Sequence, residues 1–557
     1  MQNESKEHSK ITNLTPLHIA SQGKSILHMC LKVKNKVLLR KNNLMIFSYL
    51  ATIGLISMGM PMMLFKRDIW DGVIIEYNLR EESLESLRTW LFTSGWELQY
   101  YVIGSQELLS KVFNTPLRGF ILTTSLVALI ILAYEVYLLA KNSIRMTRTT
   151  AVFCSTLLLV QPTWNVLVSS VMNIHIICLS LGIMGTRLFY DVKANKRILG
   201  ILLILFSFQL NSMMLFIPTL ISVIELNERN NRTQNALKKR NFFIVLGMAV
   251  TYFLVQRIFN PNEGAYLYYN EIIIPNSPEE IRLYVKGIIN FSSFLIIPFL
   301  AIALHLPKFL SRHSLVRENT EYPWKKISYL LILFASAATP YVLVGKSTNI
   351  FDLTDWGQRQ SFLVVVPLVL LTGLLTSDFA DGAKIRRVSW TKVSQLIVLI
   401  IFSLSLLLSS FGIKLNRQIF EQQLAQAMQE VIQNPKPGLM QINGVGIPGP
   451  TFRTYESNYL LYEAYSRASW WSVIQKNLDK NFSLPAEQDL LDAGIDVYQP
   501  SLETCTSLVT IKANGFERPF ENVFRYVLEK ASSSVRVLEF KTFCDTTQVF
   551  YFKESKQ

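Results

Sequence analysis

Long runs of apolar residues dominate the chain between residues 44 and 413. A helix needs about 20 mostly apolar residues to cross the hydrocarbon core of a membrane. Eleven runs approach or reach that length, at residues 44–65, 118–140, 150–163, 172–190, 198–209, 212–225, 242–257, 284–304, 327–344, 360–376 and 393–413. The pattern predicts an α-helical polytopic membrane protein with about 11 transmembrane helices.

Four of these runs are short and form two pairs, 150–163 with 172–190 and 198–209 with 212–225. Each pair is interrupted by polar residues, around Gln161 in the first and Gln209 in the second, where the chain is predicted to turn back. The alternative for the second pair is one long tilted helix over 198–225. That alternative reverses the orientation of every later span.

The distribution of Lys and Arg favours eleven spans with the N-terminus inside. Cytoplasmic loops of membrane proteins collect these residues. With eleven spans, the segments on the N-terminal side hold 28 Lys and Arg, while the short loops at 164–171 and 210–211 hold none. Merging 198–225 would place the basic segment 377–392 outside. We therefore expect a cytoplasmic N-terminal tail over 1–43, a membrane domain over 44–413 and an external C-terminus.

Composition excludes several classes of protein. Half of the residues are hydrophobic and 17% are charged, against about 25% charged in soluble domains. A water-soluble enzyme, a disordered chain and a secreted disulfide scaffold are excluded. The net charge of +15 lies in the membrane half, because residues 414–557 carry 15 Lys and Arg against 16 Asp and Glu. The positive charge therefore reports topology, and nucleic acid is not an expected partner.

The tail over 414–557 is predicted to be a small external α+β domain. An amphipathic helix is expected over 417–433, stopped by the Pro and Gly residues at 435–438, and a second helix around 459–478. Strands are expected over 507–511 and 548–552. Cys505 and Cys544 both lie in this tail and are candidates for a disulfide if the tail lies outside the reducing compartment.

The first external loop, 66–117, carries the most informative carboxylates. Asp68 and Asp71 follow the first span directly, and in a helix their spacing would place them on one face. A carboxylate at a partly dry boundary can have a raised pKa and act as a general base. The alternative is that Asp68 pairs with Lys66 or Arg67 and that Asp71 caps the next helix. Six His residues include one near the outer face, His175, so a His-based metal cluster there is excluded.

A second group of candidates lies in the loop 345–359. Arg359 stands at the outer boundary, where its planar guanidinium suits a lipid phosphate, and Lys346 is a weaker second cation. The alternative is an arginine that reaches the interface and pairs with Asp355. Aromatic side chains at the same level suit the wall of a sugar site or an interfacial belt. The substrate-binding candidates are Trp96, Glu97, Glu76 and Trp356.

This set of features resembles the GT-C glycosyltransferases, polytopic enzymes that use polyprenyl-phosphate-linked sugars, and within them the bacterial envelope enzymes that modify O-antigen or lipid A. The resemblance covers 44–413 in architecture, and its motifs are Asp68-Ile69-Trp70-Asp71 and Arg359. It implies sugar transfer to a glycan or lipid acceptor at the outer face of the bacterial inner membrane, with a periplasmic C-terminus. Asp71, supported by Asp68, is then the base, and Arg359 and Lys346 bind the donor phosphate. No cofactor is required, although some relatives use a divalent metal such as Mg²⁺ or Mn²⁺.

Two other functions fit part of the pattern. An O-antigen polymerase or ligase would move a whole glycan, but such enzymes rely more on arginines in a large late loop. A lipid-linked-sugar transporter or flippase would need ionisable residues within the membrane, and Glu135 is the clearest of these.

Overall fold

The structure is a computed structural model, and it describes residues 42–69, 72–77, 84–227, 235–259, 272–312, 324–352, 356–377, 390–433, 438–448, 459–460, 464–465, 470–475, 505–529 and 533–543. The chain divides into two compact units, Met1–Thr52 and Ile53–Gln557. The contacts described below all lie within the second unit.

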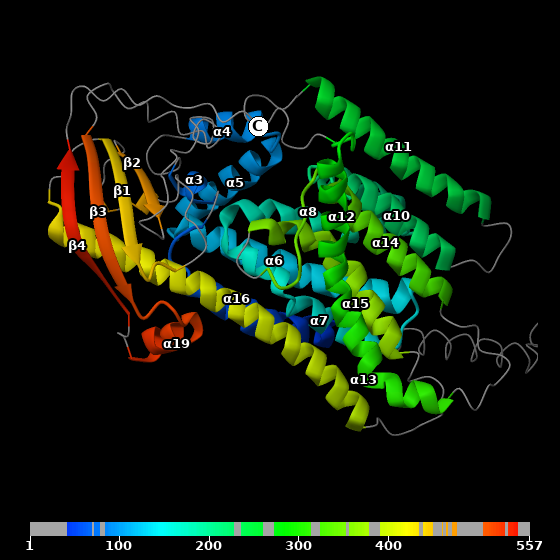
Figure 1. Ribbon diagram of the computed structural model, residues 1–557. Coiled ribbons are helices and arrows are strands. Elements are labelled where there is room, and N and C mark those ends of the chain that lie inside the picture. The colour runs from blue at the N-terminus through cyan, green and yellow to red at the C-terminus, as the bar shows by residue number, and fades with distance from the viewer. Residues whose placement is uncertain are drawn as a thin grey trace, which may run out of the picture. The chain divides into compact units, whose positions relative to one another are not determined.

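The described residues are mostly helical (Figure 1). The first apolar helix is Asn42–Met63, which includes the π-helical turn η1 (Leu55–Gly59) and α2 (Met60–Met63). The elements that follow it up to the end of the membrane part are α3 (Gly72–Tyr77), α4 (Leu84–Thr93), α5 (Glu97–Phe113), α6 (Leu117–Leu138), η3 (Leu139–Ser143), α7 (Arg148–Leu159), η4 (Pro162–Val168), η5 (Ser170–Met172), α8 (Asn173–Phe189), α9 (Ala194–Ser207), α10 (Met213–Asn227), α11 (Asn235–Phe259), α12 (Pro278–Ser292), η8 (Ser293–Leu295), α13 (Ile296–Arg312), α14 (Trp324–Leu343), η9 (Trp356–Ser361), α15 (Phe362–Ser377) and α16 (Trp390–Val431).

Each of the eleven predicted apolar runs lies mainly in helix. Among the described residues, eight helices are long and apolar enough to cross a membrane, or nine if α7 and η4, bent by 47°, count as one span. The chain is therefore a multi-pass helical membrane protein, and the count of eleven spans stays a prediction. Helix α15 is buried on all sides, from Phe362 to Leu371, as expected for a helix without a polar face.

The alternative of a single helix over 198–225 is wrong. Gly182 of α8 lies beside both Ser207, at the end of α9, and Met213, at the start of α10. At the other end of α8, the Tyr190 hydroxyl donates to the Glu225 carboxylate over 3.0 Å. The two short helices therefore form an antiparallel hairpin, and the turn at Phe208–Ser212 separates them as the polar residues there predict.

Helices α8 and α9 approach closely through two glycines. A Cβ on Gly200 would lie 2.6 Å from the Phe189 backbone nitrogen, and one on Gly185 would lie 2.9 Å from the Gly200 carbonyl. Small residues allow such close packing between membrane helices, where dispersion contacts replace the hydrophobic effect.

Gly200→Leu is expected to destabilise the protein, because backbone atoms of α8 occupy the space the new side chain needs. The expected loss is about 1–3 kcal/mol, the usual range for overpacking. Thermal unfolding in detergent measures it, with Gly247→Leu as the control, since nothing lies within 4 Å of a Cβ at Gly247. Equal melting temperatures for the two variants would contradict the packing argument.

Loops gather at the two ends of the bundle. At one end, the Arg118 guanidinium donates to the carbonyls of Phe65 and Val168. At the other end, Asn227 donates to the Ser143 carbonyl over 2.7 Å and Lys326 to the Ile144 carbonyl over 3.2 Å. These contacts bring residues 65, 118 and 168 together at one end, and residues 143, 144, 227 and 326 together at the other.

Beyond the bundle, α16 continues into a small mixed sheet. The described strands are β1 (Gly438–Val445), β2 (Trp470–Gln475), β3 (Cys505–Asn514) and β4 (Ser534–Phe543), with α19 (Pro519–Glu529) between the last two. The sheet order is β2-β1-β3-β4. Strand β1 runs parallel to β2 and β3, and β4 is antiparallel to β3.

The α+β composition of the tail is confirmed, and two details of its prediction are wrong. The helix expected over 417–433 is not separate, because α16 runs without a break from Trp390 to Val431 across the predicted boundary at 413. A helix is expected around 459–478, but Trp470–Gln475 within this range forms strand β2 and pairs with β1. Aromatic and β-branched residues favour strands. The strand expected over 507–511 lies in β3, and 548–552 lies outside the described residues.

Candidate functional site

A buried polar loop between α7 and α8 joins the candidate segments. Thr163, Asn165, Ser169 and Ser170 are all at most 3% exposed although they are polar. Buried polar groups are normally hydrogen-bonded, and the partners here come from residues 68–69, from η9 and from α16. This loop, residues 161–172, therefore fixes the elements that surround it.

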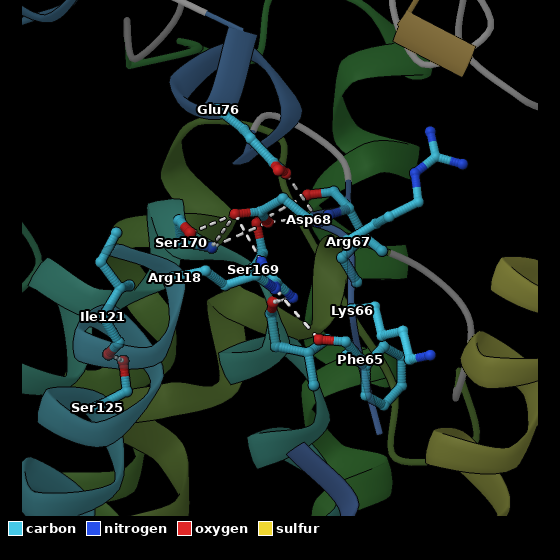
Figure 2. A network of polar contacts seen from close by, with 12 residues as sticks. Phe65, Lys66, Arg67, Asp68, Glu76, Arg118, Ile121, Ser125, Ser169 and Ser170 are labelled. Atoms are coloured by element: carbon cyan, nitrogen blue, oxygen red, sulfur yellow. Dashed lines mark hydrogen bonds and ion pairs between the residues drawn. The ribbon is translucent and has the colours of Figure 1, made fainter. Parts of the chain in front are cut away.

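Asp68 is anchored to this loop and to α6 (Figure 2). Its carboxylate lies 2.9 Å from the Arg118 guanidinium. It also accepts hydrogen bonds from the Ser170 hydroxyl and from the backbone nitrogens of Ser170 and Ile69. Burial raises the pKa of the Asp68 carboxyl, and the Arg118 charge acts in the opposite direction. The proposed pairing of Asp68 with Lys66 or Arg67 is therefore wrong, and its partner is Arg118.

The short helix α3 packs directly against this carboxylate. A Cβ on Gly72 would overlap the Asp68 side chain, at 2.0 Å from its Oδ1. The Glu76 carboxylate accepts a hydrogen bond from the Asp68 backbone nitrogen over 3.2 Å. Asp71 lies outside the described residues, but its neighbours Ile69 and Gly72 are joined by a backbone hydrogen bond of 3.2 Å. Residues 69 and 72, on either side of the pair that is not described, are thus joined to one another.

A second charged group, which we call the Arg359 cluster, consists of Arg359, Lys346, Tyr341 and His175. The charge of Arg359 acts on each of the other three. Burial, with a contribution from Arg359, lowers the pKa of Lys346 to about 7. The structure therefore brings together the two cations that the sequence proposed, one on η9 and one directly after α14.

Two residues close to this cluster in the sequence have buried polar atoms without a partner among the described residues. These atoms are Thr348 Oγ1, two residues after Lys346, and Gln360 Oε1, directly after Arg359. An amide oxygen only accepts hydrogen bonds, so Gln360 Oε1 does not favour an anion. The capacity to bind an anionic ligand here therefore rests on the charges of Arg359 and Lys346.

Two of the proposed substrate-binding residues lie beside this cluster. Trp96 packs on the His175 ring with centroids 4.7 Å apart. Glu97 begins α5 and lies 3.4 Å from Gln209 Nε2. The turn that carries Gln209 also carries Ser212, whose hydroxyl is 3.2 Å from that of Tyr341. The turn between α9 and α10 therefore connects Glu97 to the Arg359 cluster.

Neighbours of Arg359 on η9 are held by the buried loop. The Ser361 and Thr163 hydroxyls are 2.8 Å apart. Asn165 donates to the Gln358 side chain and accepts a hydrogen bond from Lys414 of α16. Both Asp68 and η9 thus contact residues 161–172, on the same end of the bundle. The charges that act on Asp68 itself are those of Arg118 and Glu76, so Asp68 and the Arg359 cluster are two separate groups.

Several proposed residues lie wholly or partly outside the described part. Asp71 and Cys544 are not described, and neither are the side chains of Trp356 and Cys505. Among the described residues, no group of three or more His, Cys, Asp or Glu side chains could hold a metal ion.

Sequence reasoning missed Arg118, Tyr341 and His175 as parts of these groups. Arg118 stands at the start of an apolar run, where a basic residue is typical of the end of a membrane span. Tyr341 lies within another apolar run. His175 was considered only as a metal ligand. Buried polar residues within apolar runs are the available signal, but Arg118 lies 50 residues from Asp68, and Tyr341 and His175 lie 18 and 184 residues from Arg359.

Comparisons with protein-family models, with curated proteins and with solved structures found no match to this chain.

Proposed function

We propose that the protein is a membrane glycosyltransferase that moves a sugar from a polyprenyl-phosphate donor to a glycan or lipid acceptor at the outer face of a bacterial inner membrane. The observation that carries this proposal is the Arg359 cluster. It brings two cations together at one end of an apolar bundle, where the phosphate of a membrane-embedded lipid would lie. Trp96, against His175, offers an aromatic surface for a sugar ring.

In this mechanism the acceptor hydroxyl attacks the anomeric carbon of the donor sugar. The carbon–oxygen bond to the phosphate breaks, and polyprenyl phosphate leaves with the bonding electron pair. Arg359 and Lys346 stabilise the negative charge that develops on the departing phosphate. A carboxylate of the first external loop takes the acceptor proton. We assign this role to Asp71, because Asp68 is already engaged by Arg118 and Ser170 and acts as a positioning residue.

A transporter is less well supported. Glu135, the acidic residue that suggested it, lies 2.6 Å from Arg187 Nε and 2.8 Å from its Nη2. Such a bidentate pair is strong and geometrically specific. It lies toward the end of α6 opposite to Arg118, and it gives Glu135 a structural role.

The proposal is tested with the full-length protein in lipid nanodiscs. The protein is supplied with a panel of polyprenyl-phosphate hexoses and pentoses and with envelope lipid extract as acceptor. Mass spectrometry then measures released polyprenyl phosphate and glycosylated acceptor. The expected result is release with one donor, lost in Asp71→Asn and Arg359→Ala. The proposal would be contradicted if the protein bound none of the donors and released no polyprenyl phosphate from any of them.

Donor binding is expected to weaken as the pH rises through 7. The Lys346 ammonium is charged below its pKa of about 7, and its charged fraction falls about tenfold between pH 6 and pH 8. A polyprenyl phosphodiester keeps one negative charge over this range. A change in donor affinity between pH 6 and pH 8 is therefore due to titration of the protein. Native mass spectrometry should show about tenfold weaker binding at pH 8, and no such change in Lys346→Arg.

Folding stability should move in the opposite direction over the same range. The folded-state pKa of Lys346 lies below its unfolded value of about 10.4, so between these values the unfolded chain binds more protons. This group therefore makes the protein more stable as pH rises from 7 to 10. Weaker donor binding accompanied by a lower melting temperature would indicate unfolding and contradict the assignment to Lys346.

A further inference from the structure

Helix α19 in the C-terminal domain has an apolar face that is exposed. Phe520, Phe524, Val527 and Leu528 are 60%, 61%, 51% and 64% exposed. At 100° per residue these four positions fall within about 100° of the helix circumference. Four large apolar side chains on one face of an 11-residue helix are unusual for a surface in water.

The opposite face of α19 is firmly held against α16. Asn522 is 3% exposed and donates to the side chain of Asn416. Asn416 in turn donates to the Phe516 carbonyl over 3.1 Å, and the Phe516 ring packs on Phe420 with centroids 5.4 Å apart. The orientation of α19 is therefore fixed by buried polar and aromatic contacts, and these direct its apolar face away from the protein.

The position of α19 along α16 identifies what covers this face. The exposed apolar residues Ile397, Ile401 and Leu408 form one stripe on α16, spaced by four and seven residues. Gly412 continues this stripe one turn further, and the Phe520 ring lies 3.4 Å from where its Cβ would be. Phe520 thus extends the apolar stripe of α16 beyond Leu408. It lies where the apolar run of α16 ends, just before the buried Lys414. Figure 1 shows α19 beside α16 where this helix passes from the bundle to the sheet.

The charges of α19 are balanced within the helix. The Glu521 carboxylate lies 2.6 Å from Arg525 and 3.4 Å from Arg518. A helix that binds anionic headgroups by charge needs an excess of Lys and Arg on its polar face. The described residues of α19 show no such excess, so its attraction to a membrane must come from apolar burial.

We infer that α19 lies in the outer interface of the membrane, with Phe520, Phe524, Val527 and Leu528 among the acyl chains next to α16. An interfacial helix of this kind buries its apolar face about 5–10 Å into the headgroup and acyl boundary. The occupant of the exposed face is lipid, because the face continues the lipid-facing stripe of a spanning helix. The C-terminal domain is thereby held at the membrane surface by α16 and α19 together. This inference does not depend on the proposed function.

The test is photo-crosslinking of the full-length protein in nanodiscs made with a lipid that carries a diazirine in its acyl chain. Peptide mass spectrometry locates the labelled residues. We expect label on the apolar face of α19 and on the stripe of α16, which serves as the internal positive control. Leu538 of β4, 62% exposed, is the matched apolar control and should stay unlabelled. Replacing neutral with anionic lipid should leave the labelling of α19 unchanged.

A triple variant, Phe524→Ser with Val527→Ser and Leu528→Ser, gives a second measurement. It leaves Phe520 and Asn522 in place, so α19 stays docked on α16. Label in 519–529 should fall at least fivefold, while label on α16 persists. Three results would overturn the inference. The first is label on α16 but none on α19 in the parent protein. The second is an α19 face that is covered by a second copy of the chain and takes no lipid label, and the third is label on α19 that appears only with anionic lipid.

Discussion

Arg359→Ala is expected to lower the rate of sugar transfer by about 100-fold to 1,000-fold, the range observed when one preorganised group that stabilises developing charge is removed. Arg359 belongs to the cluster that faces the proposed donor phosphate, and its charge reaches Lys346, Tyr341 and His175. Since the charge on the leaving phosphate grows during bond breaking, the loss should fall mainly on kcat. Release of polyprenyl phosphate in nanodiscs measures it.

Two further variants make this result specific. Arg359→Lys keeps the charge but loses the planar fork that binds phosphate through two hydrogen bonds, so it should be intermediate. Arg518→Ala removes an arginine whose side chain is 83% exposed, and it should keep full activity. A folded Arg359→Ala protein that turns over at the parent rate would exclude Arg359 from the site.

Asp68→Asn is expected to destabilise the protein by about 3–5 kcal/mol, the usual cost of removing one partner of a buried ion pair. The Asp68 and Arg118 side chains are 2% and 14% exposed. Without the carboxylate, the Arg118 charge stays buried with the carbonyls of Phe65 and Val168 as its hydrogen-bond acceptors. Thermal unfolding in detergent and the yield of monodisperse protein are the measurements.

The double variant Asp68→Asn with Arg118→Met separates a structural from a catalytic role. Replacing both charges removes the uncompensated cation, and we expect most of the lost stability to return, because an apolar replacement of a buried pair is often nearly neutral. If Asp68 only positions the loop, transfer activity should return with stability. A stable double variant without activity would instead place Asp68 among the reacting groups.

The membrane architecture could be predicted because it depends on local pattern. Apolar runs such as 118–140 and 360–376 are each long enough to identify a helix by themselves. The turn near Gln209 was also predictable, since polar residues interrupt a short apolar run there. The proximity of Lys346 to Arg359 followed from their place in one loop between two spans.

The contacts of Asp68 with Arg118 and of His175 with Arg359 could not be predicted, because they join residues that are distant in sequence. Asp68 has two basic neighbours at 66 and 67, yet its partner is Arg118, and Arg67 instead lies 3.5 Å from Glu421 of α16. Local spacing favours the nearest opposite charge, whereas the fold selects the pair that can be buried together. The unbroken course of α16 was missed for a related reason. Its composition changes at Lys414, but helix propensity does not.

The 42 residues of α16 make it about 63 Å long at 1.5 Å per residue, roughly twice the thickness of the hydrocarbon core. One continuous rod therefore extends from the membrane part to the sheet, and α19 and β4 contact it directly. The sheet must follow any tilt of this rod, and a rotation of 10° about its inner end would displace the outer end by about 11 Å. Thinning or thickening of the surrounding bilayer, which changes the tilt of spanning helices, would thus be transmitted mechanically to the C-terminal domain.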